Sequence, residues 1–124
     1  MQVLDGLAAL PLDARNREQL EWLADEVVDA GGEATIWVAE LASAAQEREL
    51  AGRMADAVAA EYRALIEDAA AARAEQAGQR RRTLGRLRRE LRRIRARDYF
   101  PPRERELAQR AVDELALLVE EPVA

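Results

Sequence analysis

The sequence of 124 residues contains no cysteine, no histidine and no lysine. Without cysteine there can be no disulfide or thiolate ligand, and without histidine the commonest general base and zinc ligand is missing. Glycine-rich phosphate loops and nucleophile elbows are absent as well. We therefore expect a protein that is not an enzyme and that holds no metal and no cofactor.

Aromatic residues make up only 4% of the chain, while apolar residues, many of them alanine, reach 49%. This mixture favours helices that pack closely through small side chains. No apolar run approaches the roughly eighteen residues of a membrane-spanning helix, and no secretory leader is recognisable. The sequence therefore predicts a cytoplasmic protein that does not enter a membrane.

The residue in excess is arginine, and its distribution along the chain is uneven. Residues 79–97 hold ten arginines and one carboxylate, a formal charge of +9, whereas residues 1–78 carry −10 and residues 98–124 carry −4. The small net charge of −5 thus conceals one strongly basic segment. Because every basic residue is arginine, each can contact a carboxylate or another oxyanion through two N–H groups.

The first forty or so residues have the pattern of a small β-β-α-β part. Asp5-Gly6 separates two short apolar runs and predicts a hairpin turn. Asn16 with Gln19 predicts the cap of a helix that ends at Gly31-Gly32, where a helix C-terminus favours glycine. Residues 33–39 are rich in β-branched and aromatic residues and predict a third strand.

From residue 43 onward the apolar residues recur with a helical period and predict three helices. Ser43 with Gln46 predicts the start of a long helix that runs to about Ala77, and Gly78 either ends this helix or lies within it. The arginine segment forms the second helix, ended by the two prolines at 101 and 102. The third helix spans about 103–119. The fold class is α+β, mostly helical, in a single domain whose parts are 1–42 (α/β), 43–119 (helical) and 120–124 (a frayed tail).

If Gly78 reverses the chain, the arginine helix packs antiparallel on the helix before it. Its apolar stripe then faces the stripe of the long helix in four pairs: Leu84 with Ala72, Leu87 with Ala69, Leu91 with Leu65 and Ile94 with Tyr62. The same register brings Glu67 and Asp68 near Arg88 and Arg89, and Glu75 near Arg81. These pairs account for some of the arginines, and the others face solvent.

Two interpretations of the remaining arginines stay open. In the first, they bind the phosphates of double-stranded DNA with release of counterions, which suits a basic helix without interleaved aromatic residues. The candidate nucleic-acid-binding residues are Arg80, Arg81, Arg82, Arg86, Arg89, Arg93 and Arg97. In the second, the chain is a dimerisation or interaction module that does not bind DNA, and carboxylates of its own or of a partner neutralise the helix. The Arg80-Arg81-Arg82 cluster is also chemically suited to an oxyanion such as chromate or sulfate.

Four stretches in the same order resemble the N-terminal region of the ChrB-type chromate-resistance regulators. They are Asn16–Leu23, Gly31–Trp37, Glu61–Leu65 and Asp98–Phe100. The resemblance implies a cytoplasmic, DNA-binding transcriptional regulator of chromate-efflux operons. It assigns no role to any single residue.

The family pattern begins earlier, with a strand and a helix before the hairpin, and usually continues into a second, C-terminal domain. If that region is ferredoxin-like, this chain lacks the central strand and residues 33–39 have no neighbour. We expect a second copy to cover this exposed strand, which makes the protein a homodimer. Trp22 lies opposite the apolar stripe of its helix and is expected to pack either on the long helices or on that second copy.

Overall fold

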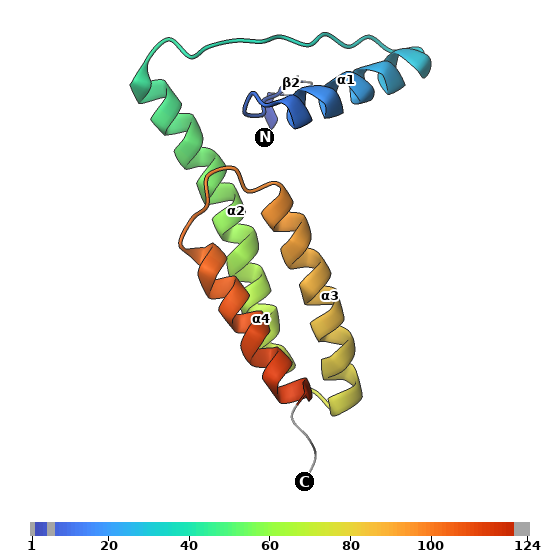
Figure 1. Ribbon diagram of the computed structural model, residues 1–124, viewed down its shortest axis with the longest axis vertical. Coiled ribbons are helices and arrows are strands. Elements are labelled where there is room, and N and C mark those ends of the chain that lie inside the picture. Colours follow the sequence, from blue (N-terminus) through green and yellow to red (C-terminus); the bar gives the residue numbers. More distant parts are fainter. Residues whose placement is uncertain (1, 5–6, 121–124) are drawn as a thin grey trace. The chain divides into compact units, whose positions relative to one another are not determined.

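The computed structural model describes residues 2–4 and 7–120 of the chain. In this part of the chain it is mostly helical, with four α-helices and one short β-hairpin (Figure 1). The chain divides into two compact units, Met1–Gln46 and Glu47–Ala124, and each is described by itself.

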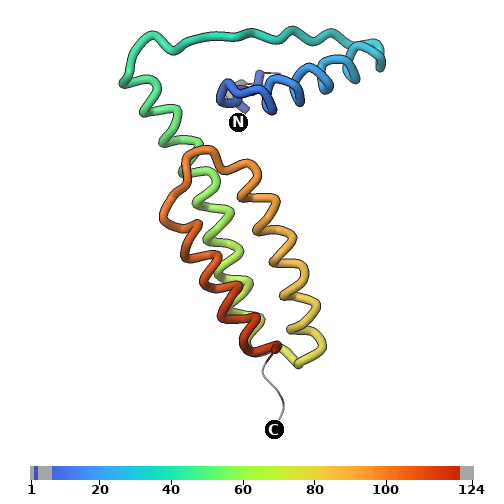
Figure 2. Tube along the Cα trace, viewed as in Figure 1, coloured from blue at the N-terminus to red at the C-terminus, as the bar shows by residue number. Residues whose placement is uncertain are grey.

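The first unit opens with the predicted hairpin, in which β1 (Gln2–Leu4) pairs antiparallel with β2 (Leu7–Ala8). The predicted turn at Asp5-Gly6 lies outside the described residues. The second unit is built from helices α2, α3 and α4, which run side by side around one core (Figure 2).

Helix α1 (Ala14–Asp29) starts earlier than its predicted cap. The N-cap is Asp13, whose carboxylate accepts a hydrogen bond of 2.7 Å from the backbone N–H of Asn16. Asn16 instead lies buried in the first turn and donates from its side-chain amide to the carbonyl of Pro11. The cap at Asn16 was therefore a wrong prediction, because aspartate three residues earlier caps equally well.

The C-terminus of α1 confirms the prediction at Gly31-Gly32. Gly31 has a φ of 89°, which glycine adopts without strain, and the N–H of Gly32 donates to the carbonyl of Val27 at 2.9 Å. A side chain at residue 32 would also meet the Val27 side chain at 2.9 Å. Both glycines are therefore needed where the helix ends.

The prediction of a third strand at 33–39 was wrong, and with it the β-β-α-β or ferredoxin-like arrangement. Residues 33–39 belong to no strand, because within the described residues β1 and β2 pair only with each other. The apolar side chains of this unit also fail to form a core, since Asn16 is its one buried residue among those whose burial is described. A high β-propensity does not make a strand without a neighbouring strand to bond.

Helix α2 (Ala44–Ala72) begins at the predicted Ser43 cap, whose hydroxyl accepts from the N–H of Gln46 at 3.2 Å. It ends before the predicted Ala77, and the chain reverses over residues 73–76. Helix α3 (Ala77–Ala96) begins after this reversal, so Gly78 lies in the first turn of α3 and does not end α2. Helix α4 (Glu104–Glu120) follows a loop that holds the two prolines.

The core of the second unit confirms the predicted antiparallel packing of α2 on α3. Tyr62, Leu65, Ala69 and Ala72 of α2 are buried against Leu84, Leu87, Leu91 and Ile94 of α3, and α4 adds Ala108, Val112, Leu115 and Ala116. In the predicted antiparallel register, the numbers of two facing residues add up to 156. For the observed ion pairs Asp68–Arg86 and Glu61–Arg97 the two residue numbers add up to a value that differs from 156 by two, so the register was predicted to within a residue or two.

Candidate nucleic-acid interface

Arg80 is part of the turn between α2 and α3. Its guanidinium donates to the carbonyls of Ala72 (3.4 Å), Arg73 (3.0 Å) and Glu75 (3.0 Å). Ala72 is the last residue of α2, and Arg73 and Glu75 lie in the turn that follows, so Arg80 fastens this turn to the end of the helix. These bonds hold Arg80 in the turn. Of the Arg80-Arg81-Arg82 cluster, only Arg81 and Arg82 therefore remain available to bind an oxyanion.

On the side of α3 that faces α2, two arginines form ion pairs with carboxylates. Arg97 lies 3.0 Å from Glu61, and Arg86 lies 3.6 Å from Asp68 and 3.2 Å from Glu90. All of these side chains are partly exposed, so each pair contributes about 0.2–1 kcal/mol to stability. Arg86 and Arg97 are thus neutralised by the protein itself.

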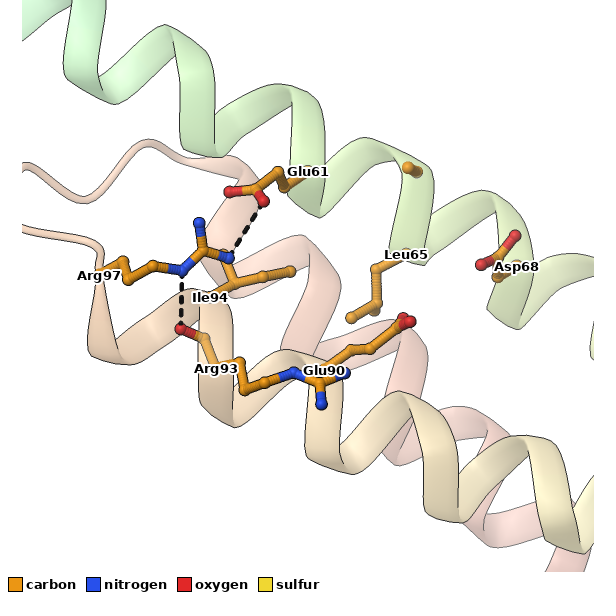
Figure 3. A pocket seen from close by; sticks show the side chains of 8 residues that line it. Glu61, Leu65, Asp68, Glu90, Arg93, Ile94 and Arg97 are labelled. Atoms are coloured by element: carbon orange, nitrogen blue, oxygen red, sulfur yellow. Dashed lines mark hydrogen bonds and ion pairs between the residues drawn. The ribbon is translucent and has the colours of Figure 1, made fainter. Parts of the chain in front are cut away.

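A shallow groove of about 320 Å³ lies between α2 and α3, and Arg93 and Arg97 line it together with Glu61, Asp68 and Glu90 (Figure 3). Leu65 and Ile94 lie in it, and Figure 3 shows Arg97 reaching across toward Glu61. Its three carboxylates and two guanidinium groups largely cancel, so the groove has little net charge to attract an ion. No group of three or more carboxylates in the described residues is arranged to hold a metal ion.

The other predicted ion pairs differ from those observed. Arg88 pairs with Glu120 of α4 at 3.5 Å, and not with Glu67. Glu75 accepts a hydrogen bond of 2.9 Å from the hydroxyl of Thr83, and not one from Arg81. Residue 88 lies on the α4 side of α3, so a register that considered only α2 and α3 could not predict its partner.

Six arginines of α3 are exposed and form no ion pair with any described residue, and one of them, Arg95, donates a hydrogen bond of 2.8 Å to Gln109. We call the other five, Arg81, Arg82, Arg89, Arg92 and Arg93, the outer arginines. Arg82 makes only a local hydrogen bond, of 2.8 Å, to Gln79. At 100° per residue, Arg82, Arg89 and Arg93 lie on the face of α3 opposite Leu87 and Leu91.

The outer arginines form a positive strip on a rigid support, because the opposite face of α3 is fixed in the core. Arg82 and Arg93 are eleven residues apart, which corresponds to about 16 Å along the helix. Four of them were predicted as site residues. Arg92 was missed, although its position three residues after Arg89 already placed it near that face. Of the other three predicted residues, Arg80, Arg86 and Arg97, each is bound within the chain.

Comparison of the chain with protein-family models, curated proteins and solved structures finds no match. Within its described residues no helix has the length and apolar character needed to cross a membrane.

Gly85 lies on the outward side of α3, between Arg82 and Arg89. A β-carbon at this position would meet only the end of the Arg89 side chain, at 3.5 Å. We expect Gly85→Ala to raise the free energy of unfolding by about 0.5–1 kcal/mol, because alanine loses less backbone entropy in a helix. Urea denaturation followed by circular dichroism measures the change.

Gly52→Ala in α2 is the matched control, since nothing lies within 4 Å of its added β-carbon. The control should stabilise α2 to a similar extent. If Gly85→Ala destabilised the protein while Gly52→Ala stabilised it, the outward face of α3 would not be open as described.

Proposed function

We propose that this chain binds the phosphate backbone of double-stranded DNA through the outer arginines, as part of a transcriptional regulator. The observation that carries the proposal is the exposure of five arginines on one helix, none of them paired with a carboxylate of the described chain. The resemblance to ChrB-type regulators supports a cytoplasmic regulator of chromate resistance in particular.

The chemistry of the strip favours a duplex over single-stranded nucleic acid. Single strands are bound largely by stacking of their bases on aromatic side chains, and α3 has none. Arginine contacts phosphate through two N–H groups, and each contact releases condensed counterions. The acidic remainder of the chain repels DNA, so binding is confined to the strip by the local field.

A titration of the protein onto duplex DNA at several salt concentrations tests this function. If each outer arginine neutralises one phosphate, the plot of log Kobs against log salt has a slope of about −4.5. Affinity then falls roughly 500-fold between 50 and 200 mM salt. Absence of binding at 50 mM salt would refute the proposal.

A non-DNA-binding interaction module is the second candidate, and one observation favours it. Half of the ten arginines in residues 79–97 already have partners within the chain, namely Arg80, Arg86, Arg88, Arg95 and Arg97. In that case the outer arginines would meet carboxylates of another protein. The same titration separates the two candidates, because such a module binds duplex DNA at no salt concentration.

A further inference from the structure

The segment of residues 33–41 connects the end of α1 to α2 as an extended chain (Figures 1 and 2). In the described part of the molecule, no backbone N–H or carbonyl of this segment takes part in a hydrogen bond. The first backbone group after it, the N–H of Ala42, donates to the Gln46 side chain at 3.2 Å. The 33–41 segment therefore presents unpaired donors and acceptors along its whole length.

The side chains at its centre are apolar and exposed on both sides. Ile36 is 40% exposed, Trp37 80% and Val38 59%. Successive side chains of an extended chain point to opposite faces, so Trp37 lies on one face and its two neighbours on the other. An extended segment with free backbone groups and apolar side chains is a template on which another strand can pair.

We propose that the 33–41 segments of two copies of this chain pair antiparallel, with Trp37 opposite Trp37 of the second copy. This pairing satisfies the free backbone groups along one edge of each segment, and on each face it brings the apolar side chains of the two copies together. It concerns the first unit alone and does not depend on DNA binding by α3.

The positions of the carboxylates and of the β-branched residues together favour this register. Antiparallel pairing centred between Ile36 and Trp37 would place Glu33 directly opposite Glu40, and like charges at opposite positions are destabilising. Centring on Trp37 moves each carboxylate opposite an uncharged residue, since Glu40 then faces Ala34 and Glu33 faces Leu41. It also places Ile36 opposite Val38, a pair of β-branched residues that favours strand pairing.

The pattern around Trp37 is nearly symmetric, which favours a second copy over an unrelated partner. One β-branched residue precedes it and one follows it, at positions 36 and 38, and small side chains occupy 35 and 39. In an antiparallel two-fold pair, a residue before Trp37 meets the residue equally far after it in the other copy, so this near-symmetry places side chains of similar kind opposite one another.

The first unit is acidic, and this gives the pairing a distinctive response to salt. Residues 1–46 hold nine carboxylates and two arginines, so two copies repel each other. Salt screens this repulsion, and the dimer is expected to strengthen as salt rises. DNA binding by the outer arginines weakens with salt, so the two proposals are separated by opposite salt dependences.

Cysteine cross-linking tests the register, because the natural chain has no cysteine. In the proposed pairing, residue 35 of one copy lies opposite residue 39 of the other, with Cα atoms about 4.5–5.5 Å apart. That separation suits a disulfide. We expect the double variant Thr35→Cys/Ala39→Cys to form covalent dimers under mild oxidation, with a higher yield at 500 mM than at 50 mM salt. Both positions are exposed, so the substitutions do not disturb a core.

Ala39→Cys alone is the control. Its two cysteines would be offset by four residues, or about 13 Å, which is too far for a disulfide. Efficient dimerisation of this single variant would instead indicate parallel pairing in register and would overturn the proposal. Absence of covalent dimers from the double variant, together with a monomer in sedimentation velocity at high salt, would overturn it as well.

Discussion

Replacement of Arg82, Arg89 and Arg93 by glutamine is expected to remove most of the salt dependence of DNA binding. Each arginine that neutralises a phosphate contributes about 0.9 to the slope, so the triple variant should lower it by about 2.7. At 50 mM salt its affinity should be more than about tenfold weaker than that of the natural chain. Fluorescence anisotropy with a labelled duplex measures both quantities.

A matched triple variant carries glutamine at Arg86, Arg88 and Arg97. It removes the same charge from the same helix, but these three arginines are already paired with Asp68, Glu120 and Glu61. We expect it to keep most of the salt slope and to lose about 0.2–1 kcal/mol of stability for each exposed pair. An equal loss of slope in both triple variants would show that total charge decides binding, and that the outer arginines have no special role.

The distinction between these two sets of arginines depends on structure that the sequence predicted only in part. The apolar stripe of α3 and its register on α2 follow from the spacing of leucines, because a helix has one period and one buried face. The exposed face of α3, with Arg89 at its centre, follows from the same helical period. The partner of Arg88 did not follow, since it depends on where α4 packs.

Two other features could not be derived from local patterns. The role of Arg80 depends on the chain reversing at residues 73–76, and alanine-rich sequence gives no sharp signal for the end of a helix. The failed strand at 33–39 has a different cause. Its residues favour a strand, but a strand exists only when a neighbour supplies hydrogen bonds, and sequence preference cannot provide that neighbour.

Alkaline pH is expected to destabilise the second unit through Tyr62. This side chain is fully buried, and its hydroxyl donates to a carboxylate oxygen of Asp98 at 2.7 Å. Burial of the phenol, followed by the hydrogen bond to Asp98, raises the pKa of Tyr62 well above its ordinary value of 10.0. The unfolded chain therefore loses this proton first, so stability is complete below about pH 10 and declines as pH rises toward the folded pKa.

The expected decline is about 1.4 kcal/mol per pH unit above pH 10, or roughly 2 kcal/mol by pH 11.5. The composition of the chain makes a change in stability in this pH range easy to assign to tyrosine. With no lysine or cysteine in the chain, tyrosine is the one side-chain type whose reference pKa lies between about 9 and 12. Urea denaturation monitored by circular dichroism between pH 8 and 11.5 gives the free energy of unfolding at each pH.

Two phenylalanine variants assign the effect to one residue. Tyr62→Phe should lose the alkaline decline, and it should be less stable by about 1–3 kcal/mol at pH 8 because Asp98 loses its donor. The other carboxylate oxygen of Asp98 is buried and has no hydrogen-bond partner in the described structure. Asp98 therefore has no second bond to make up for the loss of the Tyr62 hydroxyl. Tyr99→Phe should retain the decline. If Tyr62→Phe lost stability with pH as steeply as the natural chain does, ionisation of Tyr62 would not be what weakens the fold.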